Sequence, residues 1–236
     1  MLGRSVGRGE GARCNFDNGC AAPPFPLSPT PLPPGERGFK TMTPYKNQVR
    51  IIGGTHKRRI VRFPDMEGVP GFRPTPDRVR ETLFNWLGQD LLGKRCLDVF
   101  AGSGALAFEA ASRHATQVIA IENSRAAAQA MTQNQKLLDF PNLKIVNSDA
   151  FAFLASTPEK FDVIFLDPPF AQNWWDRLAP LIARVAAPEA LIYCEFAKEL
   201  AALPGFARTR QGRAGVVHYH LFTPADIVPT EGVPGN

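Results

Sequence analysis

The sequence has few of the residues and segments that define several common classes of protein. Its 236 residues include only four cysteines and four histidines. Cys96 and Cys194 lie in apolar runs without a partner at metal-ligand spacing, whereas Cys14 and Cys20 are too far apart for a usual zinc knuckle. No apolar run approaches the roughly 20 residues of a membrane helix, and the N-terminus lacks the apolar region of a signal peptide. We therefore expect a cytoplasmic protein without disulfide bonds, bound metal or a membrane segment.

Net charge and chain length restrict the possible functions less than these absences do. Lys and Arg number 27 against 22 Asp and Glu, and the formal net charge of +5 fits an anionic partner and a solvated basic surface equally well. With 236 residues and 44% hydrophobic content, the chain can bury a sizeable core. Composition alone therefore leaves the function open.

Composition changes along the chain and predicts four segments. Residues 1–46 are rich in Gly, Arg and Pro and have no apolar period, which predicts a disordered leader. Met42 follows the Pro-rich tract, so translation can start there or at Met1. Residues 47–75 are predicted to form a small basic β arm, residues 76–224 the main domain and residues 225–236 a flexible tail.

The main domain shows alternating strand and helix patterns. Helical segments separate short apolar runs, which are KRCLDVF, QVIAIEN, LKIVNSD, FDVIFLD and ALIYCEF, and the later stretch GRAGVVHYHLF is typical of a hairpin. This order predicts an α/β, Rossmann-like domain with a mostly parallel sheet, helices on both faces and a C-terminal antiparallel hairpin. Ligands of such sheets bind beyond the carboxyl ends of the strands. The residues that end the predicted strands are therefore the candidate site.

Three predicted strand ends carry residues suited to a nucleotide. Gly102 and Gly104 permit a tight strand-to-helix turn, although tight packing explains them equally well. Glu122 ends the second strand about twenty residues later, where a carboxylate can accept hydrogen bonds from both ribose hydroxyls, but a glutamate also falls at strand ends by chance. Asp149 ends the third strand and can contact an adenine amine or cap the following helix, and both roles stay open.

The fourth strand ends in the tetrad Asp167, Pro168, Pro169 and Phe170. Neither proline can donate to a sheet ladder and each fixes its own φ, so the chain leaves the sheet stiffly and presents the acid and the aromatic ring at its edge. A nicotinamide site would explain the glycines and Glu122 but gives this tetrad no task. An S-adenosylmethionine site explains all four strand ends, because the tetrad then faces the methyl group. We prefer this interpretation to a plain Pro-rich turn.

The same motifs carry a resemblance to a known family. DPPF together with FAGSG resembles the methyltransferases that modify exocyclic NH2 groups of bases. RPTPDRVRETLFNWL followed by CLDVFAGSGALAFEAASR resembles more narrowly the small bacterial 16S rRNA (guanine(966)-N(2))-methyltransferases, and the similarity runs from about Val49 to Phe222. Arg58 stands where that family usually has the glycine of an Arg-Gly-Arg pattern, which bears on the turn geometry of the arm.

The resemblance implies an activity, a cofactor and a substrate. The implied fold is that of a class I methyltransferase, and the implied reaction is S-adenosyl-L-methionine-dependent methylation of a guanine N2 amine in 16S rRNA, either as free rRNA or in the small ribosomal subunit. A base inside a helix cannot enter such a site, so the target must be unpaired or flipped. Adenine N6 methylation of DNA or RNA and a non-enzymatic RNA-binding module stay open as alternatives. We expect the protein to act as a monomer.

The predicted site residues fall into three groups. The catalytic group is the tetrad at residues 167–170. The predicted cofactor contacts are Thr75, Arg78, Asp98, Phe100, Gly102, Gly104, Glu122, Asn123, Asp149 and Ala150. The predicted RNA contacts lie in the basic stretch between positions 50 and 80, which contains eight Lys or Arg and only three acids. They are Arg50, Lys57, Arg58, Arg59 and Arg73.

Overall fold

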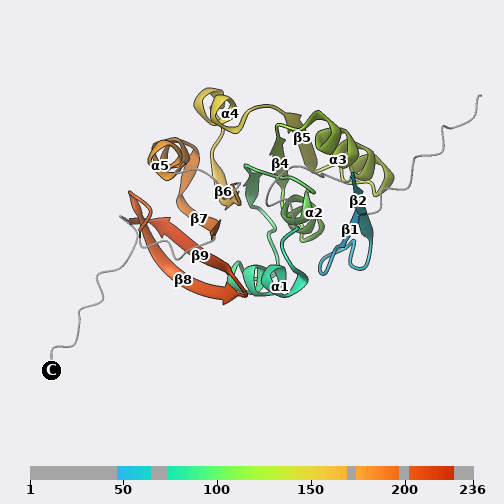
Figure 1. Cartoon of the computed structure of the whole chain (residues 1–236), viewed down its shortest axis with the longest axis horizontal. Coiled ribbons are helices and arrows are strands. Elements are labelled where there is room, and N and C mark those ends of the chain that lie inside the picture. The colour runs from blue at the N-terminus through green and yellow to red at the C-terminus, as the bar shows by residue number, and fades with distance from the viewer. Residues whose placement is uncertain (1–46, 65–73, 169–173, 197–201, 226–236) are drawn as a thin grey trace, which may run out of the picture. The chain divides into compact units, whose positions relative to one another are not determined.

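The computed structural model describes residues 47–64, 74–168, 174–196 and 202–225. Its main element is a seven-stranded sheet with the strand order β5-β4-β3-β6-β7-β9-β8 (Figure 1). The strands are β3 (Arg95–Asp98), β4 (Gln117–Glu122), β5 (Leu143–Asn147), β6 (Phe161–Leu166), β7 (Ala186–Phe196), β8 (Phe206–Ala214) and β9 (Val217–Pro224). Strands β3 to β7 pair in parallel, while β9 is antiparallel to both β7 and β8. The predicted parallel sheet with a C-terminal antiparallel hairpin is thus confirmed.

The described helices cover both faces of this sheet. They are α1 (Asp77–Trp86), α2 (Ala105–Ser112), α3 (Arg125–Leu137), α4 (Ala150–Ser156) and α5 (Trp175–Val185). Buried residues of α1, α2 and α3 share one apolar cluster with the N-terminal arm, whereas those of α4 and α5 belong to a second cluster on the opposite face (Figure 1). None of these helices has the length and apolar character needed to cross a membrane.

The strands are buried on both faces because their side chains alternate between the two clusters. Cys96 and Phe165 pack in the cluster of α1 and α2, while Leu97 and Ile164, their neighbours in sequence, pack in that of α4 and α5. This double burial explains why the strands appear in the sequence as continuous apolar runs instead of alternating ones.

The N-terminal arm is an antiparallel pair of short strands, β1 (Asn47–Arg50) and β2 (Ile60–Phe63). Val49 and Val61 are buried in the cluster of α1 and α2. The arm is also fixed to α3, because the backbone N–H of Arg62 donates to Asn134 Oδ1 at 3.0 Å and Asn134 Nδ2 donates to the Arg62 carbonyl at 2.6 Å. The arm therefore packs on the main domain as part of its structure.

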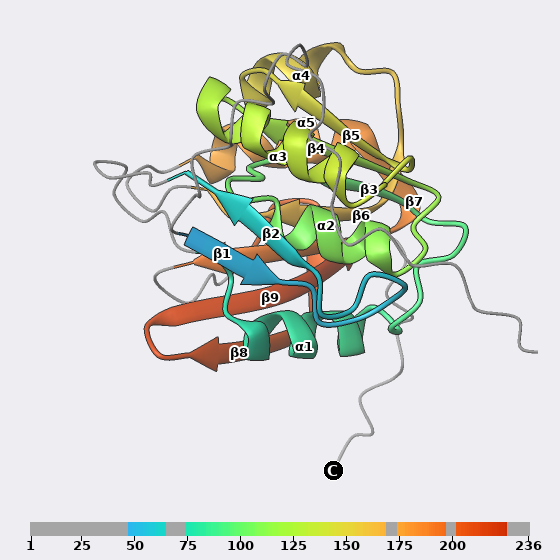
Figure 2. The same cartoon turned by 90° about the vertical axis from the view of Figure 1, so that its right-hand side faces the viewer.

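The loop between β1 and β2 is anchored to the C-terminal end of α2. The N–H groups of Thr55 and His56 donate to the carbonyl and the hydroxyl of Ser112 at 2.8 and 2.9 Å, and the Ser112 hydroxyl donates to the Gly53 carbonyl at 2.6 Å. Helix α2 starts at the carboxyl edge of the sheet, just after β3, so its C-terminal end lies at the amino edge. The loop therefore lies at the edge opposite the carboxyl ends of the parallel strands (Figure 2).

The conformation of Arg58 gives a physical reason to expect a glycine at this position. Arg58 has a φ of 73°, in the left-handed region that a residue with a side chain rarely adopts. Its N–H donates to the Ile51 carbonyl at 2.8 Å, which closes the loop on itself. This chain thus keeps the turn and accepts the backbone strain of an arginine.

Candidate active site at the carboxyl edge of the sheet

Three carboxyl groups project from one face of the sheet at its carboxyl edge. Asp98 ends β3 and is paired with Phe165, which lies two residues before Asp167. The last pair between β6 and β7 joins Leu166 to Cys194, so the parallel register brings Asp167 beside Glu195. Residues two apart in a strand share a face, and so do directly paired residues, so Asp98, Asp167 and Glu195 face the side that carries α1 and α2.

Their surroundings raise the pKa of all three groups. Burial raises the pKa of Asp98 to about 7. Burial first, and then the negative charges of Glu195 and Asp98, raise the pKa of Asp167 well above its usual value. Burial also raises the pKa of Glu195, against the lowering effect of hydrogen bonds from Thr75 and Tyr193. This edge therefore holds carboxyl groups with increased proton affinity, a property common at sites of proton transfer.

The glycine turn after β3 is built on Asp98. The Asp98 side chain is 2% exposed and accepts hydrogen bonds from the N–H groups of Ala107 and Phe100. Gly102 and Gly104 both have positive φ, and a Cβ at position 104 would lie 2.8 Å from the sulfur of Met131. The positive φ and this close contact therefore favour glycine at position 104, and Asp98 holds the backbone of the turn through its hydrogen bonds.

Glu122 connects the end of β4 to this turn. Its Oε2 accepts the N–H of Gly102 at 2.8 Å and its Oε1 accepts the N–H of Ser124 at 2.6 Å. The pKa of Glu122 is raised by burial, while these backbone hydrogen bonds act to lower it. Each carboxylate oxygen has two lone pairs, so both can still accept a ribose hydroxyl. A half-buried carboxylate held against a glycine turn fits the ribose of a nucleoside.

Of the three remaining predicted cofactor contacts around β4 and β5, two are exposed to solvent and one is buried. Asp149 is exposed, and its Oδ1 caps α4 by accepting the N–H of Ala152 at 2.9 Å. The capping alternative from the sequence is thus realised, and it uses one of the two carboxylate oxygens. Asn123 is exposed beside Glu122, and Ala150 is buried as the first residue of α4.

Phe100, Arg78 and Thr75 are the other predicted cofactor contacts. Phe100 is half-buried, and the centroid of its ring lies 5.6 Å from that of Trp174. Trp174 was not among the residues predicted from the sequence. Arg78 is exposed on α1, whereas Thr75 is buried and donates to Glu195. In the predicted tetrad, Asp167 and Pro168 stand at the end of β6, and Pro169 and Phe170 lie outside the described residues.

The predicted RNA contacts separate into two places. Arg50 pairs with Asp77 at 3.3 Å, at the start of α1 and near the carboxyl edge. Lys57, Arg58 and Arg59 are exposed on the loop at the amino edge. Arg73 lies outside the described residues. The basic arm therefore has cations near the carboxyl edge of the sheet and at its amino edge.

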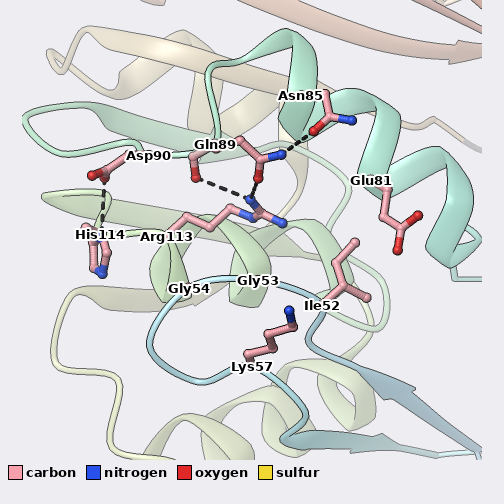
Figure 3. A pocket seen from close by; sticks show the side chains of 10 residues that line it. All are labelled: Ile52, Gly53, Gly54, Lys57, Glu81, Asn85, Gln89, Asp90, Arg113 and His114. Carbon is pink, nitrogen blue, oxygen red and sulfur yellow. Dashed lines mark hydrogen bonds and ion pairs between the residues drawn. The ribbon is translucent and has the colours of Figure 1, made fainter.

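A polar pocket of about 550 Å³ lies beside the amino-edge loop (Figure 3). Lys57 and Arg113 line it together with His114 and Asp90, whose Nδ1 and Oδ1 atoms are hydrogen-bonded at 3.1 Å. Arg113 donates to the carbonyl and the side chain of Gln89. The pocket lies at the edge opposite Glu122 and Asp167 and is therefore separate from the candidate active site. Within the described ranges, no group of His, Cys, Asp and Glu has the arrangement of a metal site.

Comparison with known proteins identifies close relatives. The family model described as Conserved hypothetical protein 95 matches residues 49–223. Ribosomal RNA small subunit methyltransferase D of Escherichia coli (strain K12) is 43% identical over 180 residues, which cover 74% of this chain and 89% of that protein. The protein of the same description from Haemophilus influenzae is 37% identical over 192 residues, which cover 78% of this chain and 98% of that protein.

Solved structures agree with these matches. One from Escherichia coli has a TM-score of 0.68 at 42% identity and covers 75% of this chain and 98% of its own. One from Haemophilus influenzae has a TM-score of 0.62 at 34% identity, with coverage of 75% and 99%. An RNA methyltransferase from Salinibacter ruber, solved with S-adenosyl-L-homocysteine, shares the fold at a TM-score of 0.53 and 17% identity, over 70% of this chain and 98% of its own.

Proposed function

The chain belongs to the family that the ribosomal RNA small subunit methyltransferase D proteins represent, the 16S rRNA (guanine(966)-N(2))-methyltransferases, and from this premise we propose how it acts. The protein methylates the exocyclic N2 amine of a guanine in 16S rRNA. S-adenosyl-L-methionine is the cofactor, and when bound it supplies a methyl group carried on a positively charged sulfur. The reaction takes place at the carboxyl edge between β3 and β6.

Guanine N2 needs help from the protein because its lone pair is delocalised into the ring. Asp167 and the carbonyl of Pro168 are the acceptors that the tetrad offers to the two N–H bonds of the amine. Accepting these bonds orients the amine and lets its nitrogen become pyramidal, so the lone pair is aimed instead of shared with the ring. The same acceptors stabilise the positive charge that develops on the nitrogen, and they therefore bind the transition state better than the ground state.

The cofactor is assigned to the residues around the glycine turn. Glu122 would hold the ribose through its two carboxylate oxygens, and Gly102 would let the ligand approach the backbone. Asp149 would contact the adenine amine with the carboxylate oxygen that does not cap α4. Asp98 contributes indirectly, because it fixes the turn on which these contacts depend.

One observation carries this assignment. Asp167 of the tetrad lies at the same edge and on the same face of the sheet as Asp98, which supports the glycine turn, and Glu122 is bonded to that turn. The four strand ends suspected from the sequence belong to β5, β4, β3 and β6, which are consecutive in the sheet, and this order supports a shared site. A nicotinamide enzyme would leave Asp167 without a role there.

The basic residues of the arm favour an RNA substrate that extends across the protein from the active site to the amino edge. The six residues of β4 span about 20 Å at ~3.3 Å per residue, so the two edges of the sheet are roughly that far apart. Lys57, Arg58 and Arg59 would contact phosphates, which position an RNA without reading its sequence. Arg50 would contact RNA closer to the base.

Mass spectrometry of rRNA nucleosides tests the function. Cells that lack this gene are expected to lose one N2-methylguanosine from 16S rRNA, and the wild-type gene should restore it while an Asp167→Ala copy should not. Loss of N6-methyladenosine instead would support the adenine alternative. An unchanged set of modified nucleosides would point to a non-enzymatic RNA-binding module and contradict the proposal.

Replacing Glu122 tests the cofactor site. Glu122→Ala is expected to weaken S-adenosylhomocysteine binding by about 10- to 100-fold, or ~1.5–3 kcal/mol, because two hydrogen bonds to a charged acceptor are lost. Isothermal calorimetry measures the affinity. Glu81→Ala, which removes an exposed carboxylate on α1, serves as the control and should bind like the wild type. Equal affinity in Glu122→Ala and wild type would remove the main support for this site.

A further inference from the structure

Glu195 is the carboxyl group at the active edge to which neither the sequence nor the proposed function assigns a role. It is 4% exposed and follows Cys194 near the end of β7. Its Oε1 accepts two hydrogen bonds, from the Thr75 hydroxyl at 2.8 Å and from the Tyr193 hydroxyl at 3.0 Å. The strand register places it directly beside Asp167.

The two hydroxyl donors favour the ionised form of Glu195. A hydrogen bond given to a carboxylate stabilises its charge, and the bonds from Thr75 and Tyr193 lower the pKa that burial raises. Burial and the charge of Glu195 raise the pKa of Tyr193 well above its usual value, so this phenol keeps its proton and remains a donor. Glu195 therefore has two side-chain hydroxyl donors, whereas Asp98 accepts hydrogen bonds from the backbone N–H groups of Ala107 and Phe100.

Asp167 lies among negative groups. Among the described residues, the groups that act on its charge are Asp98 from β3 and Glu195 from β7. Tyr193 lies on the same face of β7, two residues before Glu195. Both carboxylates oppose the ionisation of Asp167, and Glu195 is the larger influence of the two. A fixed negative charge beside a carboxylate increases its affinity for a proton.

We propose that Glu195 is a positioning residue for the methyl transfer: it stays ionised between Thr75 and Tyr193, and its charge makes Asp167 the acceptor of the proton that the guanine amine loses. The inference rests on the proposed function. In the balanced step, the methyl carbon bonds to the amine nitrogen as its bond to sulfur breaks, and the sulfur keeps that electron pair. One amine proton moves to a carboxylate oxygen of Asp167, which later releases it to water.

The proposal predicts a change in the pH dependence of the reaction. Asp167 must be ionised to accept a proton, so single-turnover rates fall on the acid side as pH drops through its pKa. Glu195→Gln keeps the shape and an acceptor oxygen for Thr75 and Tyr193 but removes the charge. The pKa of Asp167 then decreases, and the acid limb is expected to move to lower pH. The plateau rate should fall on the order of tenfold, since Asp167 becomes a weaker proton acceptor.

The experiment measures single-turnover methylation of 16S rRNA from pH 5 to 9 at saturating RNA and cofactor. Glu195→Asp, which keeps the charge, should restore part of the shift. Glu189→Gln, which removes an exposed carboxylate from the same strand, should leave the profile unchanged. Calorimetry with S-adenosylhomocysteine should give the same affinity for Glu195→Gln and wild type.

The outcomes separate this inference from the proposed function. A wild-type enzyme that does not methylate guanine would overturn the function itself. A wild-type enzyme that methylates guanine while Glu195→Gln keeps the acid limb in place would overturn only the role of Glu195. A lower rate with an unshifted limb would then mean that Glu195 merely ties the Thr75 segment to β7.

Discussion

Asp167→Ala is expected to lower the single-turnover methylation rate by about 10²–10³-fold, the loss typical of one aimed electrostatic partner. Asp167 is assigned to the amine in the transition state, whereas Glu122 is assigned to the cofactor in ground and transition states alike. Affinities for S-adenosylhomocysteine and RNA should therefore stay close to wild type. Rates at saturating RNA and cofactor, together with both binding constants, measure this separation.

Two further variants sharpen this test. Asp167→Asn should be milder than Asp167→Ala because its amide oxygen still accepts a hydrogen bond. Reversing the charges of Lys57 and Arg59 should do the opposite, weakening RNA binding and flattening its salt dependence while leaving cofactor affinity unchanged. A wild-type rate for Asp167→Ala under saturating conditions would show that the tetrad does not aim the amine.

The sequence predicted the architecture well because the strands are short apolar runs separated by helices. It also located Asp98, Glu122, Asp149 and Asp167, since a residue that ends a parallel strand must lie at the carboxyl edge. The hairpin was recognised over residues 212–222 only, while β8 begins at Phe206. The first half of β8 has mostly exposed side chains and lacks the apolar signal of a core strand.

Glu195 and Arg80 are among the buried charged groups that were not predicted. Glu195 follows the apolar run ALIYC, and its position there was the available signal, but its partner Thr75 lies 120 residues away. Arg80 counted among the basic residues of a presumed RNA-binding stretch, yet its side chain is 1% exposed. Glu195 and Thr75 are brought together only by the tertiary fold. An arginine that will be buried also cannot be distinguished from a solvated one by the pattern of its neighbours in the sequence.

The burial of Arg80 is explained by a polar network that joins the arm, α1 and α2. Glu109 is fully buried on α2 and accepts Arg80 Nη1 at 3.3 Å, Arg113 Nε at 2.8 Å and the N–H of Ile52 at 2.9 Å. Arg80 also donates to the carbonyl of Arg50 at 2.9 Å. One carboxylate thus connects two guanidinium groups and the backbone of the arm.

Glu109→Ala is expected to reduce the free energy of unfolding by about 3–5 kcal/mol, the cost typical of leaving buried charge without its partner. The substitution leaves Arg80 and Arg113 without their shared counter-charge and the Ile52 N–H without its acceptor. Asp77, whose carboxylate lies 2.5 Å from Arg80 Nη2, compensates only part of this loss because its side chain is 46% exposed. Urea unfolding followed by circular dichroism measures the change.

Two controls show whether the buried charge is the cause. Glu81→Ala removes an exposed carboxylate from α1 and should change stability by at most ~0.5 kcal/mol. Replacing Arg80, Glu109 and Arg113 together with Met, Leu and Met removes all three charges at similar volume, and this variant should be more stable than Glu109→Ala. If the triple variant is instead the less stable of the two, the hydrogen bonds of the network, and not its unpaired charge, determine how firmly the arm is held on α2.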